Sequence, residues 1–390
     1  MDSKETIPSL TYSEPLRQSS INVCQKCKRK FLYKYRWSLY PKKVAVSPAA
    51  NAGKMVHWLL EHGPDSVSEF ETNLQEKAQE METMIDQGLD PFGEIADRIK
   101  QLRDQANKAK VICQITWDRF GENPDEEVLC KEREISTGII LTDASGDLHE
   151  ILLEGVIDKL IRSRKSGRIW ARDFKTSSRD PLFTLTGYQF STQCRLYRLL
   201  AEAFLFGEAV SKDPEYISRE QIGDNPQVFG FCVDWMALPN IIMSGADRDY
   251  KEYEHTFTRG ARKGETEIRR DYEGEPKFEN YLNRCKQWYK DKGDEVFVSQ
   301  AIAYTEDVIP KELYSALLVT WAYTNCDPDP ELFPRDITAT ACKAYERQCE
   351  YYPLCSSDYS VWPSLMETAY QFKTPEQVKE EIQGKDKINE

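Results

Sequence analysis

The chain has 390 residues, of which 40% are hydrophobic and 30% charged, and a net charge of −13. This composition lets the chain bury a core as one large domain or two smaller ones, and it excludes a disordered protein. No apolar run approaches the roughly 20 residues that cross a bilayer. The N-terminus also lacks a basic start followed by an apolar core, so we expect a cytoplasmic protein.

The first predicted element follows a polar leader that ends near Pro15. Residues 19–37, SSINVCQKCKRKFLYKYRW, predict one helix with basic residues in its later turns. Cys27, Phe31 and Tyr35 recur every four residues, which places them on one helical face. We therefore expect the cysteine to point inward beside aromatic side chains.

A second helix is predicted at 50–63, and it carries His57 and Glu61 one turn apart. A single histidine among apolar neighbours is ordinarily a core or boundary residue. Residues 69–120 are charged and helical in pattern, with an interruption at 88–91. They predict two helices that either pack on the core or form a lobe beside it.

Residues 126–158 alternate strand-like runs with turn residues at 136–138 and 143–146. This alternation predicts an antiparallel meander. We expect Glu132 and Glu134 on its first strand to face solvent, although either is within reach of the hairpin that follows.

The stretch 154–175 holds the densest chemistry in the chain. ILLEGVIDKLI and RIWARDF predict two strands joined by the turn RSRKSG. Asp158 lies on the first strand, and Asp173 and Lys175 on the second point to the same side because strand side chains alternate faces. Two carboxylates and an amine suit metal-dependent phosphodiester cleavage, whereas an isolated D-x-K would be a solvated hairpin.

The chain then predicts a helix within 187–207, with Gln193 and Tyr197 one turn apart. No internal repeat is present. The later segments predict a buried strand at 228–238, a partner strand at 253–258, a helix at 271–291 and a polar tail from 374.

Cysteines gather at both ends of the chain. Cys342, Cys349 and Cys355 form C-x₆-C-x₅-C, while Cys24 and Cys27 lie near the start. Three thiolates from one segment and one from the other make a four-sulfur site for zinc or an iron–sulfur cluster, and the spacing leaves the metal open. The other cysteines predict buried free thiols: Cys113, Cys130, Cys194, Cys232, Cys285 and Cys326.

Four of these patterns resemble a known family. Gly155 to Asp158, Asp173 to Lys175 and Gln193 to Tyr197 resemble the G-x-x-D, [D/E]-x-K and Q-x-x-x-Y motifs of RecB-like nucleases in the PD-(D/E)XK superfamily. Gly53 to His57 resembles the G-x-x-x-H helix of that branch. The resemblance implies an α/β fold, with a mixed central β-sheet flanked by helices and further helical additions.

The resemblance also implies roles for individual residues. One or two Mg²⁺ or Mn²⁺ ions would be held by His57, Asp158, Asp173 and the main-chain carbonyl of Phe174. Lys175 would position or activate the attacking water, and Glu61 would fix the imidazole tautomer. Gln193 and Tyr197 would contact a DNA phosphate or hold the catalytic strand.

The cysteines resemble those of AddB-type RecB-like nucleases and CRISPR-associated exonucleases, which bind a [4Fe–4S] cluster. Residues 27–31 resemble the C-P-R-x-F run of those proteins, with Lys28 in place of Pro, so we prefer Cys27 to Cys24. The x₆ interval resembles the phage and plasmid branch. The implied cluster ligands are Cys27, Cys342, Cys349 and Cys355, with zinc as the alternative metal, and they would clasp the two ends of the chain together.

We therefore expect a metal-dependent DNA nuclease, in the first place an exonuclease, that acts on single- or double-stranded DNA ends in replication, recombination or repair. It would work in the cytoplasm, in the host if phage-encoded, with a helicase or recombination protein as a partner. The alternatives are a CRISPR-adaptation exonuclease and a non-cutting DNA-binding or assembly subunit. Polarity, strand preference, metal count and oligomeric state stay open.

One nuclease domain over 1–390 is expected. Its predicted parts are N-terminal helices (19–63), a helical lobe (69–120), a catalytic core (126–206), additional strands and helices (225–325), a cluster segment (326–360) and the tail (374–390). The net charge opposes DNA binding, but three local basic patches could line one groove, with ordinary solvated faces as the alternative. They lie within 26–34, 162–168 and 259–270.

Overall fold

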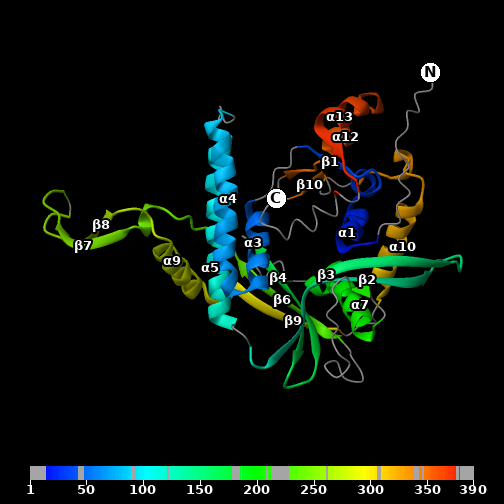
Figure 1. Ribbon diagram of the computed structural model, residues 1–390, viewed down its shortest axis with the longest axis horizontal. Coiled ribbons are helices and arrows are strands. Elements are labelled where there is room, and N and C mark those ends of the chain that lie inside the picture. Colours follow the sequence, from blue (N-terminus) through cyan, green and yellow to red (C-terminus); the bar gives the residue numbers. More distant parts are fainter. Residues whose placement is uncertain are drawn as a thin grey trace.

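The centre of the molecule is a six-stranded mixed sheet (Figure 1). The computed structural model describes residues 15–42, 48–88, 93–120, 123–177, 185, 187–207, 210–211, 228–260, 262–304, 309–336, 342–344, 347–374 and 377. The strand order is β5–β2–β3–β4–β6–β9, in which β4 and β6 are parallel and every other pair is antiparallel. The prediction of an α/β fold with a mixed central sheet is confirmed.

The strands of this sheet differ in how their two faces are covered. The strands are β2 (Glu126–Thr142), β3 (Leu148–Ser163), β4 (Ile169–Ser177), β5 (Val210–Ser211), β6 (Val228–Ala237) and β9 (Phe297–Ala303). The β2–β3 hairpin alternates buried and exposed positions along much of its length, as a strand with one covered face does. Strand β6 is buried along almost its whole length because helices cover both of its faces.

Helices lie on opposite faces of the sheet. Helix α7 (Thr192–Phe206) packs on the face that carries Ala171 and Val233. Helices α3 (Pro48–His62), α5 (Glu94–Phe120) and α9 (Phe278–Lys292) pack on the face that carries Phe174 and Met236. Within the described ranges, none of the helices is both long enough and apolar enough to cross a membrane.

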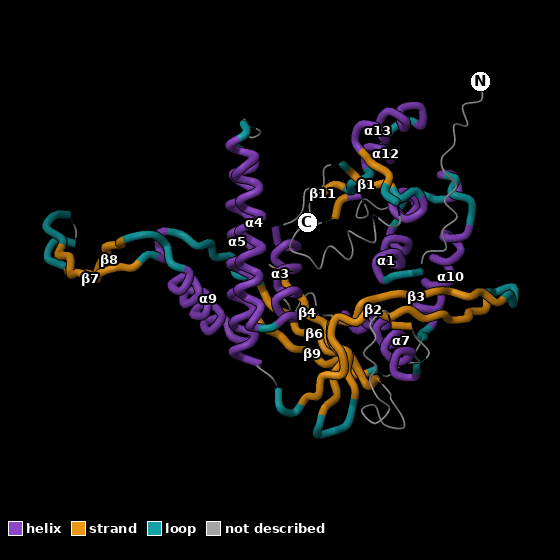
Figure 2. Tube along the Cα trace, in the orientation of Figure 1, coloured by secondary structure: helices purple, strands orange, loops and turns teal. Residues whose placement is uncertain are grey.

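Two extensions project from this core. Helix α4 (Val67–Asp86) pairs with α5 as an antiparallel helical lobe, as the sequence predicts (Figures 1 and 2). Strands β7 (Asp249–Thr256) and β8 (Thr266–Glu273) form a separate hairpin that reaches far from the sheet. The prediction that 253–258 pairs with the buried strand is therefore wrong, since β6 pairs with β4 and β9.

Two further predictions from local pattern are wrong. Residues 136–138 do not turn, because β2 continues through them opposite β3. Residues 271–291 are not one helix, since β8 extends to Glu273 and α9 begins at Phe278. In each case the pairing partner, which the local sequence does not show, decides where the element ends.

The prediction of one helix at 19–37 is also wrong, because the helix is interrupted at Cys27. Helix α1 (Gln18–Lys26) ends there, Cys27 is extended with φ −158° and ψ 111°, and α2 (Lys28–Phe31) starts in a new direction. Cys27 Sγ accepts a 3.5 Å hydrogen bond from the main-chain N–H of Lys30 and so caps α2. A π-helical turn (Leu32–Arg36) follows.

The two ends of the chain meet in a small core of their own. Strand β1 (Leu39–Pro41) pairs antiparallel with β12 (Tyr370–Phe372). Buried aromatic residues join the two segments, among them Tyr33, Tyr351 and Trp362. The remaining elements here are α10 (Lys311–Asn325), β10 (Lys343–Ala344), β11 (Arg347–Gln348), α12 (Tyr352–Ser356) and α13 (Trp362–Ala369).

Candidate active site

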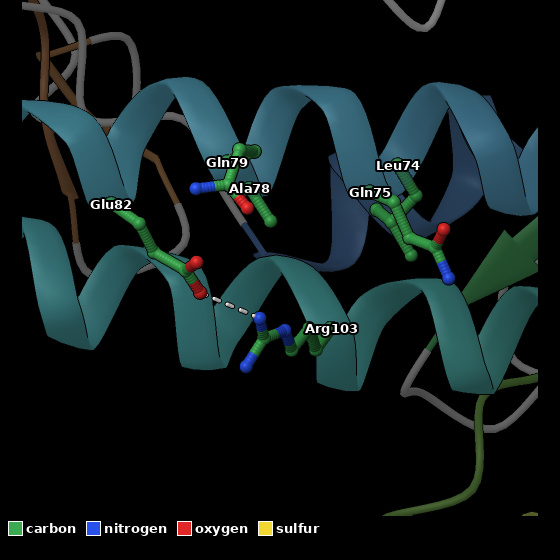
Figure 3. Close-up of a pocket in the computed structure, with 6 residues that line it drawn as sticks. All are labelled: Leu74, Gln75, Ala78, Gln79, Glu82 and Arg103. Atoms are coloured by element: carbon green, nitrogen blue, oxygen red, sulfur yellow. Dashed lines mark hydrogen bonds and ion pairs between the residues drawn. The ribbon is translucent and has the colours of Figure 1, made fainter.

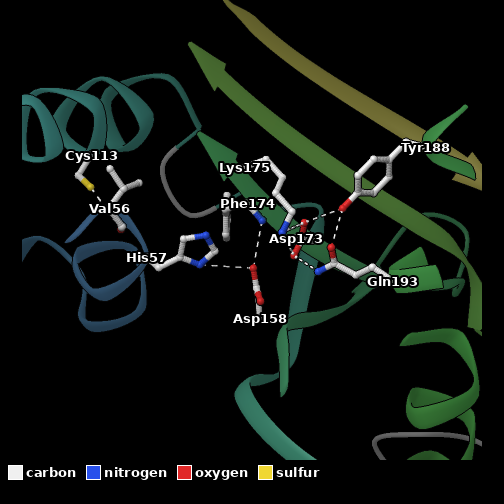
Figure 4. A network of polar contacts seen from close by, with 9 residues as sticks. All are labelled: Val56, His57, Cys113, Asp158, Asp173, Phe174, Lys175, Tyr188 and Gln193. Carbon is white, nitrogen blue, oxygen red and sulfur yellow. Dashed lines mark hydrogen bonds and ion pairs between the residues drawn. The ribbon is translucent and has the colours of Figure 1, made fainter. Parts of the chain in front are cut away.

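The site forms where β3 separates from β4. These strands pair only from Lys159 opposite Arg172 to Arg162 opposite Ile169, while β4 continues alongside β6. Asp158 therefore lies just beyond the last β3–β4 pair. Its Oδ2 accepts a 3.1 Å hydrogen bond from the main-chain N–H of Phe174, which bridges the separating strands (Figure 4).

Asp173 is the most enclosed group of the site, with no exposed surface. Its Oδ1 accepts hydrogen bonds from Lys175 Nζ at 2.8 Å and from Gln193 Nε2 at 2.9 Å (Figure 4). Burial raises the pKa of Asp173 to about 7, and the Asp158 carboxylate adds to the shift, although Lys175 opposes it. A nearby cation would favour the ionised form of this carboxyl.

His57 reaches the site from α3. Its Nδ1 lies 3.5 Å from Asp158 Oδ2, and its side chain is 34% exposed. Burial lowers the pKa of His57, and the Lys175 ammonium lowers it further, which favours the neutral imidazole that binds metal ions. The predicted role of Glu61 falls outside the described side chains.

Two glycines explain how the helices come so close to the strands. A Cβ on Gly53 would lie 2.9 Å from Thr176 Oγ1, so this glycine lets α3 approach β4 one turn before His57. A Cβ on Gly155 would lie 2.7 Å from Leu200 Cδ1, so it lets α7 approach β3.

Helix α7 faces the site with Gln193 and Tyr197. The Ser191 side chain caps the helix by accepting from the Cys194 N–H, which fixes its start beside the site. Gln193 donates to Asp173, as described above. Tyr197 is 9% exposed, and its ring packs edge-on to Phe231 at 5.8 Å. Burial raises the pKa of its hydroxyl, and the Asp158 and Asp173 carboxylates raise it further, so the hydroxyl faces the site.

Sequence reasoning missed Tyr188, which precedes α7 in a short 3-10 turn (Tyr188–Phe190). Its hydroxyl donates to Gln193 Oε1 at 2.8 Å and lies 3.5 Å from Asp173 Oδ2. Its ring stacks on Phe231. The sequence offered little to predict this contact. Tyr188 lies five residues before Gln193, in a segment whose residues follow no helix or strand spacing.

The sequence favoured a solvent-facing Glu132 but left open that it could reach the site, and the structure places it at the site. An imidazole nitrogen of His57 and one carboxylate oxygen each of Glu132 and Asp158 all lie within 4.8 Å of one another. Among the described residues, this is the only group of three or more His, Cys, Asp or Glu side chains that meets this distance. Imidazole nitrogen and carboxylate oxygens are suitable donors for Mn²⁺ or Mg²⁺, so the residues fit a divalent ion.

Two of the predicted cluster cysteines, Cys349 and Cys355, pack against the core that joins the chain ends. All four predicted ligands lie in the described part of the chain, and no three of their thiols are within 4.8 Å of one another. Burial raises the pKa of the Cys355 thiol, and the charge of Cys27 adds to the rise, although a hydrogen bond with Tyr33 opposes it. The Cys349 N–H donates to the Cys342 carbonyl at 2.8 Å. Cys24 is fully buried and its neighbours are instead Lys28, Thr320 and Cys326.

The three basic patches do not line one groove. Arg29 is buried and donates to the Phe333 and Pro330 carbonyls. The patch at 259–270 lies on the projecting β7–β8 hairpin, far from α1 and α2 (Figure 1). Ion pairs with acidic neighbours occupy many of the cations: Arg162–Glu127, Lys165–Asp125, Arg262–Glu265, Arg269–Glu267 and Arg270–Glu252.

A pocket of about 240 Å³ lies between α4 and α5, away from this site (Figure 3). Its wall includes an ion pair of 2.9 Å between Glu82 and Arg103. The remaining lining residues are Leu74, Gln75, Ala78 and Gln79. The Glu82 carboxylate is paired with Arg103, and the other lining side chains are apolar or amides, so we assign no metal to this gap in the helical lobe.

Comparison with known proteins agrees with this geometry. A search of curated proteins finds no match. A scan against protein-family models matches residues 15–296 to the PD-(D/E)XK nuclease superfamily, a range that includes every residue shown in Figure 4. Because this range covers most of the chain, the protein belongs to the PD-(D/E)XK nuclease superfamily.

Proposed function

We propose that this protein is a RecB-like, metal-dependent DNA nuclease, and that it acts as an exonuclease in DNA replication, recombination or repair. Superfamily membership supports phosphodiester hydrolysis. The observation that carries the proposal is the convergence of His57, Asp158, Asp173 and Lys175 at the separation of β3 and β4. We place the protein in the cytoplasm, as a single nuclease domain of phage origin with a helicase or recombination partner.

The proposed reaction divides its tasks among the side chains. A bound Mg²⁺ or Mn²⁺ ion supplies Lewis acidity and offsets negative charge at the phosphate. His57, Asp158, Asp173 and the Phe174 carbonyl hold the ion or ions. Lys175, whose Nζ is 2.6 Å from Asp173 Oδ2, orients the attacking water by donating a hydrogen bond to it.

Gln193 and Tyr188 position the carboxylate that Lys175 contacts. Gln193 donates to Asp173 and accepts from Tyr188, so the three groups form one chain of hydrogen bonds. This arrangement supports a positioning role for Gln193. The Tyr197 ring packs against the sheet, while the Asp158 and Asp173 carboxylates act on its hydroxyl, which supports a role in holding the catalytic strand beside the site.

We also propose that Cys27, Cys342, Cys349 and Cys355 bind a [4Fe–4S] cluster, with zinc as the alternative. The charge of Cys27 acts on Cys355, whereas Cys24 is influenced by Thr320 and Cys326 near α10, and this difference supports Cys27 as the N-terminal ligand. The cluster would have a structural role, because the same core already joins the two chain ends.

The test is cleavage of linear single-stranded, linear double-stranded and circular DNA by the purified full chain. We expect cleavage of linear DNA with Mg²⁺ or Mn²⁺, none in EDTA, and loss of activity in Asp173→Ala and Lys175→Ala. Glu150→Gln is the control, because Glu150 is exposed near the far end of the β2–β3 hairpin. Full cleavage in EDTA or by Asp173→Ala would refute the proposal, and cleavage of circular DNA would indicate an endonuclease.

A further inference from the structure

Glu132 interrupts the regular geometry of β2. Its φ of +41° lies in the left-handed region, which residues other than glycine rarely adopt. The β2–β3 register passes from Lys131 opposite Lys159 to Arg133 opposite Ile157, so Glu132 lies across from Asp158. Such a backbone costs free energy and persists only where its surroundings hold it, which makes it a marker of function to be tested.

This backbone geometry accompanies a Glu132 side chain that faces the site. Its carboxylate, an imidazole nitrogen of His57 and a carboxylate oxygen of Asp158 all lie within 4.8 Å of one another. The Glu132 carboxylate also acts on Lys175. Burial lowers the pKa of Lys175, but the carboxylates of Asp173, Asp158 and Glu132 raise it, and the net shift of the pKa is upward. Three elements, α3, β2 and β3, thus deliver one donor each.

Asp173 is engaged differently. Its Oδ1 accepts from Lys175 and Gln193, and its Oδ2 lies 2.6 Å from Lys175 Nζ. Protein donors therefore contact both oxygens of this carboxylate. The donors that converge as one group are those of His57, Glu132 and Asp158, and Asp173 is not a member of that group.

We propose that Glu132 is a protein ligand of the active-site metal ion, which it holds together with His57 and Asp158. The inference rests on the proposed function, in which this centre is metal-dependent. Two carboxylates balance the charge of a divalent cation, and a mixed oxygen and imidazole set suits Mn²⁺. The left-handed backbone at Glu132 directs this side chain of β2 toward the ion.

The test is calorimetric titration of the metal-free full chain with Mn²⁺, without DNA. We expect Glu132→Gln to weaken Mn²⁺ binding by roughly ten-fold or more, since loss of even an indirect metal contact costs that much. Glu150→Gln, the exposed control on β3, should bind as the wild type does. Unchanged affinity in Glu132→Gln, with weakened binding in His57→Ala and Asp158→Ala, would overturn the inference and leave the nuclease proposal intact.

A second variant separates a metal role from a purely structural one. Glycine adopts positive φ without strain, so metal-free Glu132→Gly should melt at a higher temperature than the wild type. Added Mn²⁺ should raise that melting temperature less than it raises the wild-type value. An equal rise in both proteins would overturn the ligand role. Weakened Mn²⁺ binding by Glu132→Gln in a protein that cleaves no DNA would support the ligand role and refute the nuclease.

Discussion

The main-chain N–H of Phe174 donates to the Oδ2 of Asp158 at 3.1 Å, so a side chain continues the β3–β4 ladder after its last main-chain pair. The Asp158 carboxylate thereby holds the separating strands at a fixed distance. In the proposed nuclease, the same oxygen faces His57 at 3.5 Å. Asp158 therefore has a structural contact as well as its proposed role at the metal.

Two substitutions of Asp158 should separate these roles. Asp158→Asn keeps an oxygen acceptor for Phe174, so its stability should stay near the wild-type value while DNA cleavage is lost. Asp158→Ala should lose cleavage and also roughly 1–3 kcal/mol of unfolding free energy, because the N–H is left without that acceptor. Urea unfolding of the metal-free proteins measures the difference, and equal stability of the two variants would contradict the structural contact.

Tyr188→Phe should lower the cleavage rate by roughly ten-fold, since the hydroxyl orients Gln193 and, through it, Asp173. The ring remains stacked on Phe231, so the fold should persist. Tyr304→Phe is the matched control, because it removes a tyrosine hydroxyl that donates to the Cys194 carbonyl on α7. A similar loss of rate in both variants would indicate a general effect on α7.

The stability of the metal-free protein should fall as pH rises from about 4 to about 7. The pKa of Asp173 is about 7 in the folded chain, against roughly 3.9 when unfolded. The folded state therefore holds a proton that the unfolded state has lost in this window, and raising the pH removes that advantage. Thermal unfolding of the wild type and Asp173→Asn in EDTA measures it, and the asparagine variant should show a smaller slope.

Metal binding should follow the opposite trend. Because a ligating carboxylate must be ionised, Mn²⁺ should bind more tightly as pH rises through about 7. Mn²⁺ should therefore raise the melting temperature more at pH 8 than at pH 6. A stabilisation that is independent of pH would exclude Asp173 from the metal site.

Cys27→Ser and Cys24→Ser should differ in metal content. If Cys27 is the N-terminal ligand, as its influence on Cys355 supports, the first variant should lose iron. It should also lose the brown colour, with absorbance near ~400 nm, that an anaerobically prepared cluster protein shows. Cys24→Ser should keep both, because Cys24 lies beside Thr320 and Cys326. Iron and zinc analysis decides the metal, and loss of iron from Cys24→Ser alone would reverse the assignment.

Arg29→Ala should loosen the contact between the chain ends without any change at a cysteine. Its buried guanidinium donates to the Phe333 and Pro330 carbonyls at 2.8 and 2.6 Å, and losing two charge-assisted bonds should cost about 3 kcal/mol. Lys30→Ala removes an exposed pair with Glu350 that joins the same segments, and should cost only about 0.5 kcal/mol. Urea unfolding and limited proteolysis near both ends measure the contrast.

Short-range spacing in the sequence was sufficient to predict that the Asp173 and Lys175 side chains lie together. Asp173 and Lys175 are two residues apart on a strand, and they share a face because of the strand period. The sequence also placed His57 on a helix, but the reason for Gly53 beside it became visible only where α3 meets Thr176. Motifs of this kind are predictable because each spans a single element.

Residues whose position depends on backbone irregularities could not be predicted in this way. Glu132 reaches the site through one positive φ in a continuous strand, and no turn residue marks it. The helix break at Cys27 lies in the run KCKRKF, which has no glycine or proline. It is favoured by Arg29, which donates to the Phe333 carbonyl 304 residues later in the chain. Strand β7 likewise pairs with β8, a pairing that the apolar pattern of β7 alone did not predict.

The pairing of β1 with β12 also sets an order of events during synthesis. Leu39 pairs with Phe372, so the first strand leaves the ribosome more than 300 residues before its partner. At about 5–20 residues per second, that interval lasts from roughly 15 s to one minute. The central sheet, which ends at β9, is made before β12 appears. The N-terminal aromatic side chains therefore lack these partners, or bind a chaperone, until residues 351–372 have been synthesised.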